Sequence, residues 1–121
     1  MIKEFLNGLI QDVTNTFVIN EIVLLEVFHY LIKRFGPTKG KELALKLMNN
    51  SFIEIEYSII NENSVLETLD ILVKYGVTTT IGGRDSTIIR TMRTTGVMNI
   101  ISHDRAFELV ENLQLIDPLE D

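Results

Sequence analysis

Three acidic side chains stand at positions where a carboxylate could do chemistry. Glu26 lies within the most apolar stretch of the chain, where an ionised carboxylate is costly unless it is paired or bound to a cation. Asp104 closely follows an apolar segment, and Asp85 follows two consecutive glycines and an arginine. If these side chains converge, their oxygens suit a hard cation such as Mg²⁺ or Mn²⁺, which can activate water against a phosphoryl group.

Each of these residues also has an ordinary structural interpretation. Asp85 and Asp104 are both placed to cap the start of a helix, a position that aspartate favours. Glu26 could bond to His29, one turn along the same helix, or reach solvent. Ser102 could cap the following helix or orient Asp104. The histidines of the chain are more typical of packed or surface positions than of metal ligands.

The composition is that of a globular protein without disulfides. The chain has 121 residues, of which 45% are hydrophobic and 23% are charged, enough for one domain with a core. It contains no cysteine, which excludes a disulfide scaffold and a cysteine nucleophile and suits a reducing cytoplasm. No apolar run approaches the roughly 18 residues of a membrane span, and the first residues lack the pattern of a secretory signal. We therefore expect a single cytoplasmic domain over residues 1–121.

The charges are unevenly distributed. A net charge of −6 argues against broad electrostatic binding to nucleic acid. Two basic groups nevertheless occur, the first Lys33, Arg34, Lys39, Lys41 and Lys46, the second Arg84, Arg90, Arg93 and Arg105. These groups form either a local basic rim or ordinary solvated helix faces, and the sequence leaves both interpretations open.

Helices and strands are predicted to alternate along the chain. The predicted helices cover residues 2–11, 21–35, 38–49, 64–75, 85–95 and 105–112. The predicted strands cover residues 16–19, 52–57, 97–101 and 113–116, the second an edge strand and the third buried on both faces. Asn20 should cap one helix, Gly36-Pro37 should end it, and Asn63-Ser64 should cap a later one. Such alternation indicates βα units, a mostly parallel sheet, and a site beyond the carboxyl ends of its strands.

Several segments together resemble the PIN domain family, the fold of VapC-type toxin ribonucleases. The family's third acidic motif resembles residues 82–89, GGRDSTII, and its fourth resembles residues 100–107, IISHDRAF. The strand, polar cap and helix that carry the family's acidic glutamate resemble residues 17–20, FVIN, followed by Glu26. The last strand of the family is similar to residues 115–118, LIDP. The order and spacing of these motifs agree across nearly the whole chain.

The resemblance implies a fold, an activity and a set of site residues. The fold would be a three-layer α/β/α domain with a mostly parallel sheet, and the activity would be metal-dependent endoribonuclease. Glu26, Asp85 and Asp104 would be the catalytic carboxylates that hold Mg²⁺ or Mn²⁺, and Ser102 would support the site through a hydrogen bond. From their charge and position we infer that Arg84 and Arg105 contact RNA phosphates. The implied partners are an RNA substrate and an antitoxin protein.

One part of the family pattern has no counterpart here. PIN domains open with a central strand that ends in the first acidic Asp, and this chain begins where a later helix of the family should be. Asp12 does not replace that residue, because only fourteen positions separate it from Glu26, too few for the intervening helices. The alternative function is therefore a catalytically inactive PIN-like module that acts through protein–protein contact.

The missing strand also has a structural consequence. Its two neighbours would stand about 9–10 Å apart, twice the ordinary strand spacing, with unpaired backbone groups between them. We therefore expect either a rearranged sheet or a homodimer in which a strand from another chain fills the gap.

Overall fold

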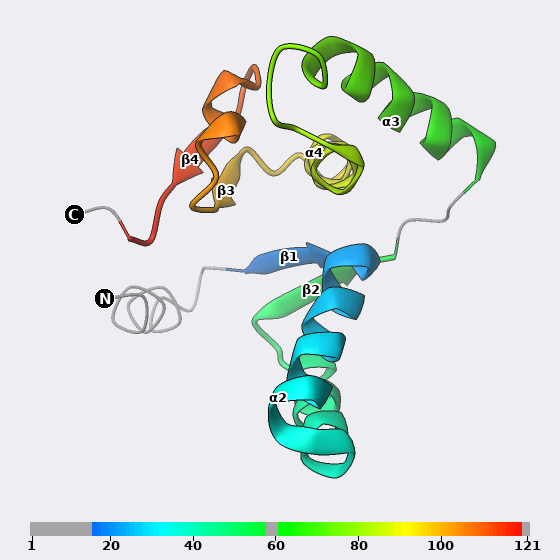
Figure 1. Cartoon of the computed structure of the whole chain (residues 1–121), viewed down its shortest axis with the longest axis vertical. Coiled ribbons are helices and arrows are strands. Elements are labelled where there is room, and N and C mark those ends of the chain that lie inside the picture. The colour runs from blue at the N-terminus through cyan, green and yellow to red at the C-terminus, as the bar shows by residue number, and fades with distance from the viewer. Residues whose placement is uncertain (1–15, 58–60, 120–121) are drawn as a thin grey trace. The chain divides into compact units, whose positions relative to one another are not determined.

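The computed structural model describes residues 16–57 and 61–119, which belong to two compact units. The first, here the N-terminal unit, contains strand β1 (Phe17–Asn20), helix α2 (Glu21–Met48) and strand β2 (Ile53–Glu56) (Figure 1). The second, here the C-terminal unit, contains α3 (Glu62–Tyr75), α4 (Gly83–Thr95), β3 (Asn99–Ile101), the 3₁₀ helix η1 (Arg105–Leu109) and β4 (Gln114–Ile116). The helix predicted at residues 2–11 lies outside the described residues.

All the described strands pair in parallel, in two separate sheets of two strands each. In the N-terminal unit β1 pairs with β2, with Ile19 opposite Ile55. In the C-terminal unit β3 pairs with β4, with Ile100 opposite Leu115. The parallel pairs and the helices that accompany them confirm the predicted α/β class. Among the described residues no strand joins β1 to β3.

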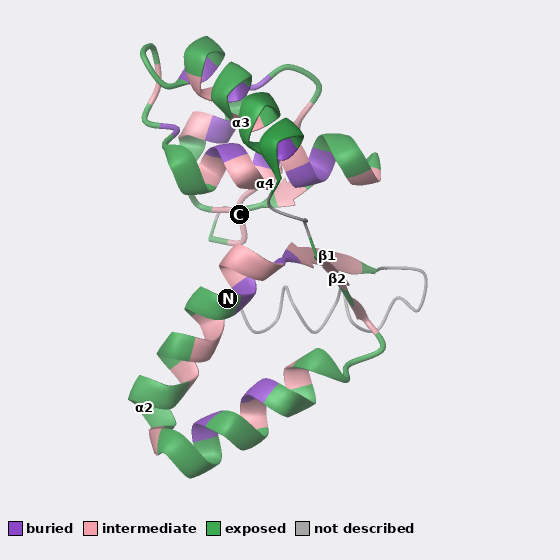
Figure 2. Cartoon of the chain, turned by 90° about the vertical axis from the view of Figure 1, so that its right-hand side faces the viewer, coloured by how far each residue is buried: buried purple, intermediate pink, exposed green. Residues whose placement is uncertain are grey.

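Helix α2 changes direction at Gly36. The helix begins where the Asn20 side chain accepts a 2.9 Å hydrogen bond from the Val23 backbone. At Gly36 the backbone has a φ of 85°, a left-handed conformation that favours glycine, and a proline follows. The two halves then approach closely, because a Cβ added to Gly40 would lie 2.7 Å from the Ile32 Cα. The predicted break between two helices at this point is confirmed (Figure 2).

The N-terminal unit buries few of its described side chains. On α2 the buried residues are Leu24, Gly40 and Ala44. On β2 Glu54 is exposed while Ile53 and Ile55 are half-buried, as the predicted edge strand requires. The strand ends at Glu56, so Tyr57 does not continue its apolar face and is instead 60% exposed. Although α2 is long, none of the helices in the described part of the chain is both long and apolar enough to cross a membrane.

The C-terminal unit contains a continuous hydrophobic core. Its buried members come from α3, α4, η1 and the segments beside them: Ile71, Tyr75, Ile81, Ile89, Phe107 and Val110. Ile100 of β3 and Leu115 of β4 pack against this cluster, so the strand pair is attached to the helices through its inner face. The buried segments of α3 and α4 are visible in Figure 2. This core positions the ends of β3, β4 and α4.

Helix α3 begins two residues earlier than predicted. Its cap is Asn61, whose side chain accepts a 2.9 Å hydrogen bond from the Ser64 backbone. In return the Ser64 hydroxyl accepts a 3.0 Å hydrogen bond from the Asn61 backbone N–H, which completes a capping box. Asn63 therefore lies inside the first turn. The helix ends at Gly76, as predicted.

Two expectations for the last part of the chain are wrong. The strand at residues 97–101 is not buried on both faces, because Asn99 and Ile101 of β3 are exposed and only Ile100 turns toward the core. Residues 105–112 do not form an α-helix; they contain the short 3₁₀ helix η1, after which Val110 is extended and Asn112 has a φ of 65°. These backbone conformations lead the chain directly into β4.

Candidate functional site

Polar side chains follow the two neighbouring strands of the C-terminal unit. Ser102, His103 and Asp104 come directly after β3, and Asp117 comes directly after β4. The Ser102 backbone N–H donates a 3.1 Å hydrogen bond to the carbonyl of Ile116, which ties the two strand ends together. Because the strands are parallel, these side chains occupy the same edge of the sheet, where sites form in α/β folds.

Asp104 is held at this edge by its neighbours. Its backbone N–H donates a 3.0 Å hydrogen bond to the Ser102 hydroxyl. Its Oδ1 accepts a 2.9 Å hydrogen bond from the Ala106 backbone and thereby caps η1. Of the two roles open to Ser102, the structure favours orientation of Asp104, through the backbone of that residue. The predicted capping role of Asp104 is also present, and it engages one of the two carboxylate oxygens.

Asp85 is the third residue of α4, and its side chain is 15% exposed. Its Oδ2 accepts a long hydrogen bond of 3.5 Å from the backbone of Gly82, and its Oδ1 lies 3.9 Å from the guanidinium of Arg84. A negative charge in the first turn is stabilised by the partial positive charge at the helix N-terminus. Asp85 is therefore not the N-cap residue, which is Gly82; it lies in the first turn, where its half-buried carboxylate bonds back to the backbone of the cap.

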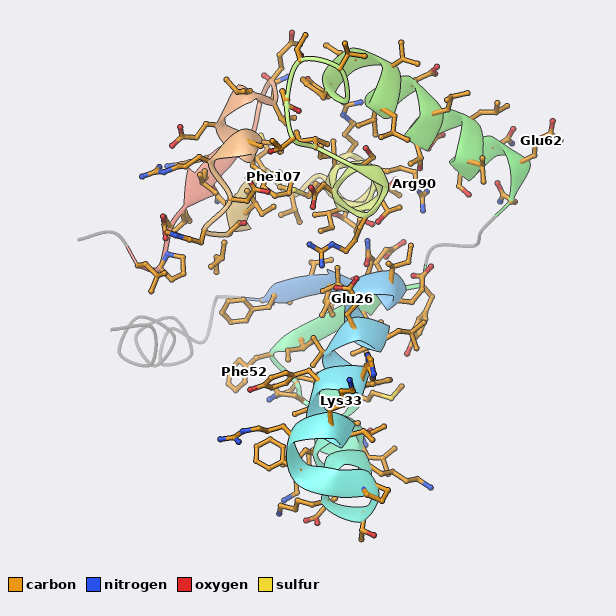
Figure 3. All side chains as sticks on the ribbon, in the orientation of Figure 1. Glu26, Lys33, Phe52, Glu62, Arg90 and Phe107 are labelled. Carbon is orange, nitrogen blue, oxygen red and sulfur yellow. The ribbon has the colours of Figure 1, made fainter. Side chains whose placement is uncertain are left out.

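Glu26 lies in the first part of α2, in the N-terminal unit (Figure 3). Its side chain is exposed, although its sequence neighbours are apolar. The apolar residues around it are divided between faces, with Leu24 3% exposed and Leu25 62% exposed. The structure thus places Glu26 on the solvent-exposed face of the helix, where a charged side chain does not have to be buried among apolar groups.

The carboxylates fit a divalent ion by the chemistry of their donors. Mg²⁺ and Mn²⁺ bind oxygen ligands, and carboxylates are the usual protein source. Within residues 16–57 and 61–119, however, no three or more His, Cys, Asp or Glu side chains are grouped so that they could hold a metal ion. Asp85 and Asp104 belong to the C-terminal unit and Glu26 to the N-terminal unit. The described residues therefore supply suitable ligand types but not a preformed metal cage.

Arginines flank both aspartates of the C-terminal unit. The Arg84 side chain is 55% exposed beside Asp85, and the Arg105 side chain is 50% exposed and pairs with Glu108 one turn along η1. Arg90 is different, because its side chain is only 13% exposed and lies 4.0 Å from Glu67 across the α3–α4 interface. Arg90 thus has a structural role, whereas the two flanking arginines remain accessible.

The basic group on α2 is exposed to solvent. Lys39 and Lys46 share Glu42, at 3.7 Å and 3.4 Å respectively. Such exposed pairs contribute little to stability, and they neutralise part of the local positive charge. Lys33, Arg34 and Lys41 are exposed as well. This surface is compatible with both interpretations of the basic group, a rim that meets phosphates and an ordinary solvated face.

Beside Asp104, the described residues include a polar pair that the sequence reasoning missed. His103 Nδ1 lies 2.9 Å from Asp117 Oδ2, and the Asp117 side chain is only 4% exposed while that of His103 is 71% exposed. The Leu119 backbone N–H holds the pKa of Asp117 below its usual value, burial acts in the opposite direction, and the His103 imidazole reinforces the lowering. The signal that could have revealed the pair is the position of both residues just beyond neighbouring parallel strands.

A comparison with models of protein families identifies the family of this chain. The family model described as PIN domain matches residues 2–113, which is most of the chain and includes both units. None of the curated proteins matches the chain. None of the solved structures matches it either. The chain therefore belongs to the PIN domain family, a nuclease superfamily whose members generally use divalent metal ions and act on RNA.

Proposed function

We propose that this protein is a metal-dependent endoribonuclease of the VapC toxin type, which hydrolyses RNA phosphodiesters. The observation that carries the proposal is the placement of Asp104 directly beyond β3, with its backbone fixed by Ser102. Family membership supplies the reaction class, and the carboxyl end of a parallel strand is where α/β folds place their sites.

In this proposal Glu26, Asp85 and Asp104 hold Mg²⁺ or Mn²⁺. When bound, the ion supplies an activated water and neutralises charge on the phosphate. The protein contributes position: Ser102 fixes the backbone of Asp104, and the start of α4 fixes that of Asp85. Fixed carboxylates lose little freedom when an ion binds, which favours binding.

The same proposal assigns the arginines to the RNA backbone. Arg84 and Arg105 are half-exposed beside the two aspartates, so their guanidinium groups can reach phosphate oxygens next to the reacting one. In this proposal the exposed lysines of α2 contact further phosphates of the RNA. Because such contacts release counterions, the affinity for RNA should fall steeply as salt is added.

The proposed partners follow from the open strand edges. Within the described residues β1 is hydrogen-bonded to β2 alone and β3 to β4 alone. Open edges of this kind accept a further strand. We propose that a strand from a second copy completes the sheet in a homodimer, that an antitoxin protein is the regulatory partner, and that the cysteine-free chain works in a reducing cytoplasm.

The test is an RNA-cleavage assay with Mn²⁺, with Mg²⁺ and with a chelator. Cleavage should require the metal and should fall by about a hundredfold or more in Asp104→Asn and Asp85→Asn, the usual effect of removing a positioned catalytic group. Asp70→Asn is the matched control, because Asp70 is an exposed aspartate on α3. Full cleavage by both site variants would refute the assignment.

A second candidate function is a catalytically inactive PIN-like module that acts through protein–protein contact. It is favoured by the lack of a preformed three-ligand metal group within the described residues. Calorimetric titration with Mn²⁺ distinguishes the two. Binding that Asp85→Asn and Asp104→Asn both weaken supports the nuclease, whereas no Mn²⁺ binding together with no cleavage supports the inactive module.

A further inference from the structure

The pair formed by His103 and Asp117 lies beside the candidate site, and the proposed chemistry does not use it. His103 stands between Ser102 and Asp104 at the end of β3. Its ring is 71% exposed, although its Nδ1 is 2.9 Å from the buried carboxylate of Asp117. An exposed ring anchored by a buried carboxylate is a side chain held in one orientation while its other edge faces outward.

Asp117 is itself fixed on both of its oxygens. Oδ2 faces His103 Nδ1, and Oδ1 accepts a 2.9 Å hydrogen bond from the Leu119 backbone N–H. The Ser102 backbone N–H also donates to the Ile116 carbonyl at 3.1 Å, so the backbones on either side of the pair are joined. A carboxylate with both oxygens engaged and 4% of its side chain exposed has little freedom to rotate. The hydrogen bond to this fixed carboxylate therefore holds the His103 imidazole in a defined position.

The chemistry of the pair determines which ring nitrogen faces a ligand. A carboxylate accepts hydrogen bonds, so Nδ1 carries the ring proton and donates a hydrogen bond to the Asp117 carboxylate. The remaining polar atom of the exposed ring is Nε2. Asp104 and Arg105 follow His103 directly in the chain, and Asp117 is the charged group that the ring contacts. Nε2 thus belongs to an exposed ring whose residue directly precedes in sequence the residues that we assign to the metal and to a phosphate.

We propose that Asp117 positions His103 so that Nε2 hydrogen-bonds to a ribose 2′-hydroxyl of the RNA bound at Asp104. This inference rests on the proposed function. A 2′-hydroxyl both donates and accepts hydrogen bonds, so it can pair with Nε2 whether or not that nitrogen carries a proton. A phosphate oxygen only accepts. Because the 2′-hydroxyl distinguishes RNA from DNA, His103 makes the site selective for RNA, and Asp117 is the positioning residue.

The first test compares binding of short fluorescein-labelled single-stranded RNA with binding of DNA of the same sequence. Fluorescence anisotropy in the presence of a chelator keeps the RNA intact. We expect the wild-type protein to prefer RNA, and His103→Ala to weaken RNA binding about fivefold, the scale of one hydrogen bond, while leaving DNA binding unchanged. His29→Ala is the matched control, because His29 is an exposed histidine on α2, and its preference should equal that of the wild type.

The second test reads the position of the proton on His103. Long-range ¹H–¹⁵N spectra at alkaline pH, where an imidazole is neutral, should show the His103 proton on Nδ1 in the wild type. Asp117→Asn keeps an oxygen for the Leu119 N–H but also presents an amide donor to the ring. It should shift His103 toward the tautomer with the proton on Nε2, while the contact with the 2′-hydroxyl, which either tautomer can make, should keep the preference for RNA. A merely structural role for Asp117 would leave the tautomer unchanged.

The outcomes separate this inference from the function on which it rests. A wild-type protein that binds RNA and DNA equally, or a preference that His103→Ala leaves intact, overturns the role of His103 while the nuclease assignment stands. Equal losses for RNA and DNA assign His103 to a phosphate and overturn the ribose contact. A wild-type mixture of tautomers overturns the role of Asp117. A protein that binds neither nucleic acid overturns both proposals.

Discussion

The two units contain the same motif, a parallel pair of strands, but they support it differently. In the C-terminal unit β3 and β4 pack against a core that includes Ile89, which is fully buried, and Phe107, which is 3% exposed. In the N-terminal unit α2 leaves Leu25 and Tyr30 each 62% exposed. The two aspartates of the site thus stand on a well-packed platform, while Glu26 stands on a helix with little packing of its own. The precision of the site comes from the C-terminal unit.

The largest effect is expected when a cavity is opened in the C-terminal unit, which tests whether that unit is the better packed of the two. Ile89→Ala removes a side chain with no exposed surface, and we expect it to lower the free energy of unfolding by about 3 kcal/mol. Urea denaturation measures the loss. Leu24→Ala in the N-terminal unit should lower it less, because Leu24 lies outside the buried cluster to which Ile89 belongs. An equal or larger loss for Leu24→Ala would contradict the contrast between the units.

The next test crowds the bend of the N-terminal unit. A methyl group on Gly40 would lie 2.7 Å from the Ile32 Cα, so Gly40→Ala must separate the two halves of α2. We expect a loss of about 1–3 kcal/mol, the usual effect of overpacking. Amide hydrogen exchange should increase in α2 and stay unchanged in α3 and α4.

The matched control is Gly83→Ala, because a methyl group at Gly83 meets nothing within 4 Å. This variant should leave exchange in α2 at its wild-type rate. Faster exchange throughout α3 and α4 in Gly40→Ala would show that the two units do not open separately.

A smaller effect is expected at the end of α4. Gly96 has a φ of 73°, a left-handed conformation in which an added side chain is strained. Gly96→Ala should therefore lower the free energy of unfolding by about 1 kcal/mol, measured as a shift of the urea midpoint. Gly96→Asn should lower it less, because asparagine tolerates this conformation better. Identical urea midpoints for the wild type and for Gly96→Ala would argue against the left-handed conformation of Gly96.

The smallest expected effect concerns pH. The folded-state pKa of Asp117 is lowered, chiefly by the Leu119 backbone, so its contribution to stability is present above the ordinary aspartate pKa. That contribution is lost as the pH falls through the lowered pKa. Urea midpoints across the acidic range should therefore decline less in Asp117→Asn than in the wild type. An unchanged decline, with Asp70→Asn as the control for a lost charge, would contradict this role.

Local signals in the sequence predict the turning points of the fold. Asn20 caps α2, Gly36 breaks it and Gly96 ends α4, as their residue types indicate. Each of these effects acts within one or two turns, so it can be recognised without knowledge of the partners in space. The ordered set of motifs, those around Asp85 and Asp104 among them, likewise indicates the family that the family model confirms, because it combines residue type with order along the chain.

Features that depend on distant neighbours could not be predicted in the same way. The apolar sequence of β3 suggests burial on both faces, yet Ile101 is exposed because the core covers the face of Ile100 alone. The pair of His103 and Asp117 joins residues fourteen positions apart, and it requires the register of β3 against β4. The exposure of Glu26 similarly depends on which face of α2 turns toward β2. Such features follow from packing rather than from local pattern.

The parallel pairing of β3 with β4 also bears on how the protein folds. Parallel neighbours need a crossover of about a dozen residues or more, and here residues 102–113 connect the strands with only the short helix η1 between them. A connection this short carries a low entropic cost of closure, and contacts of low sequence separation form early. The ends that carry Asp104 and Asp117 should therefore meet soon after the C-terminal segment is synthesised. This edge of the site would therefore form from contacts that lie close together in the sequence.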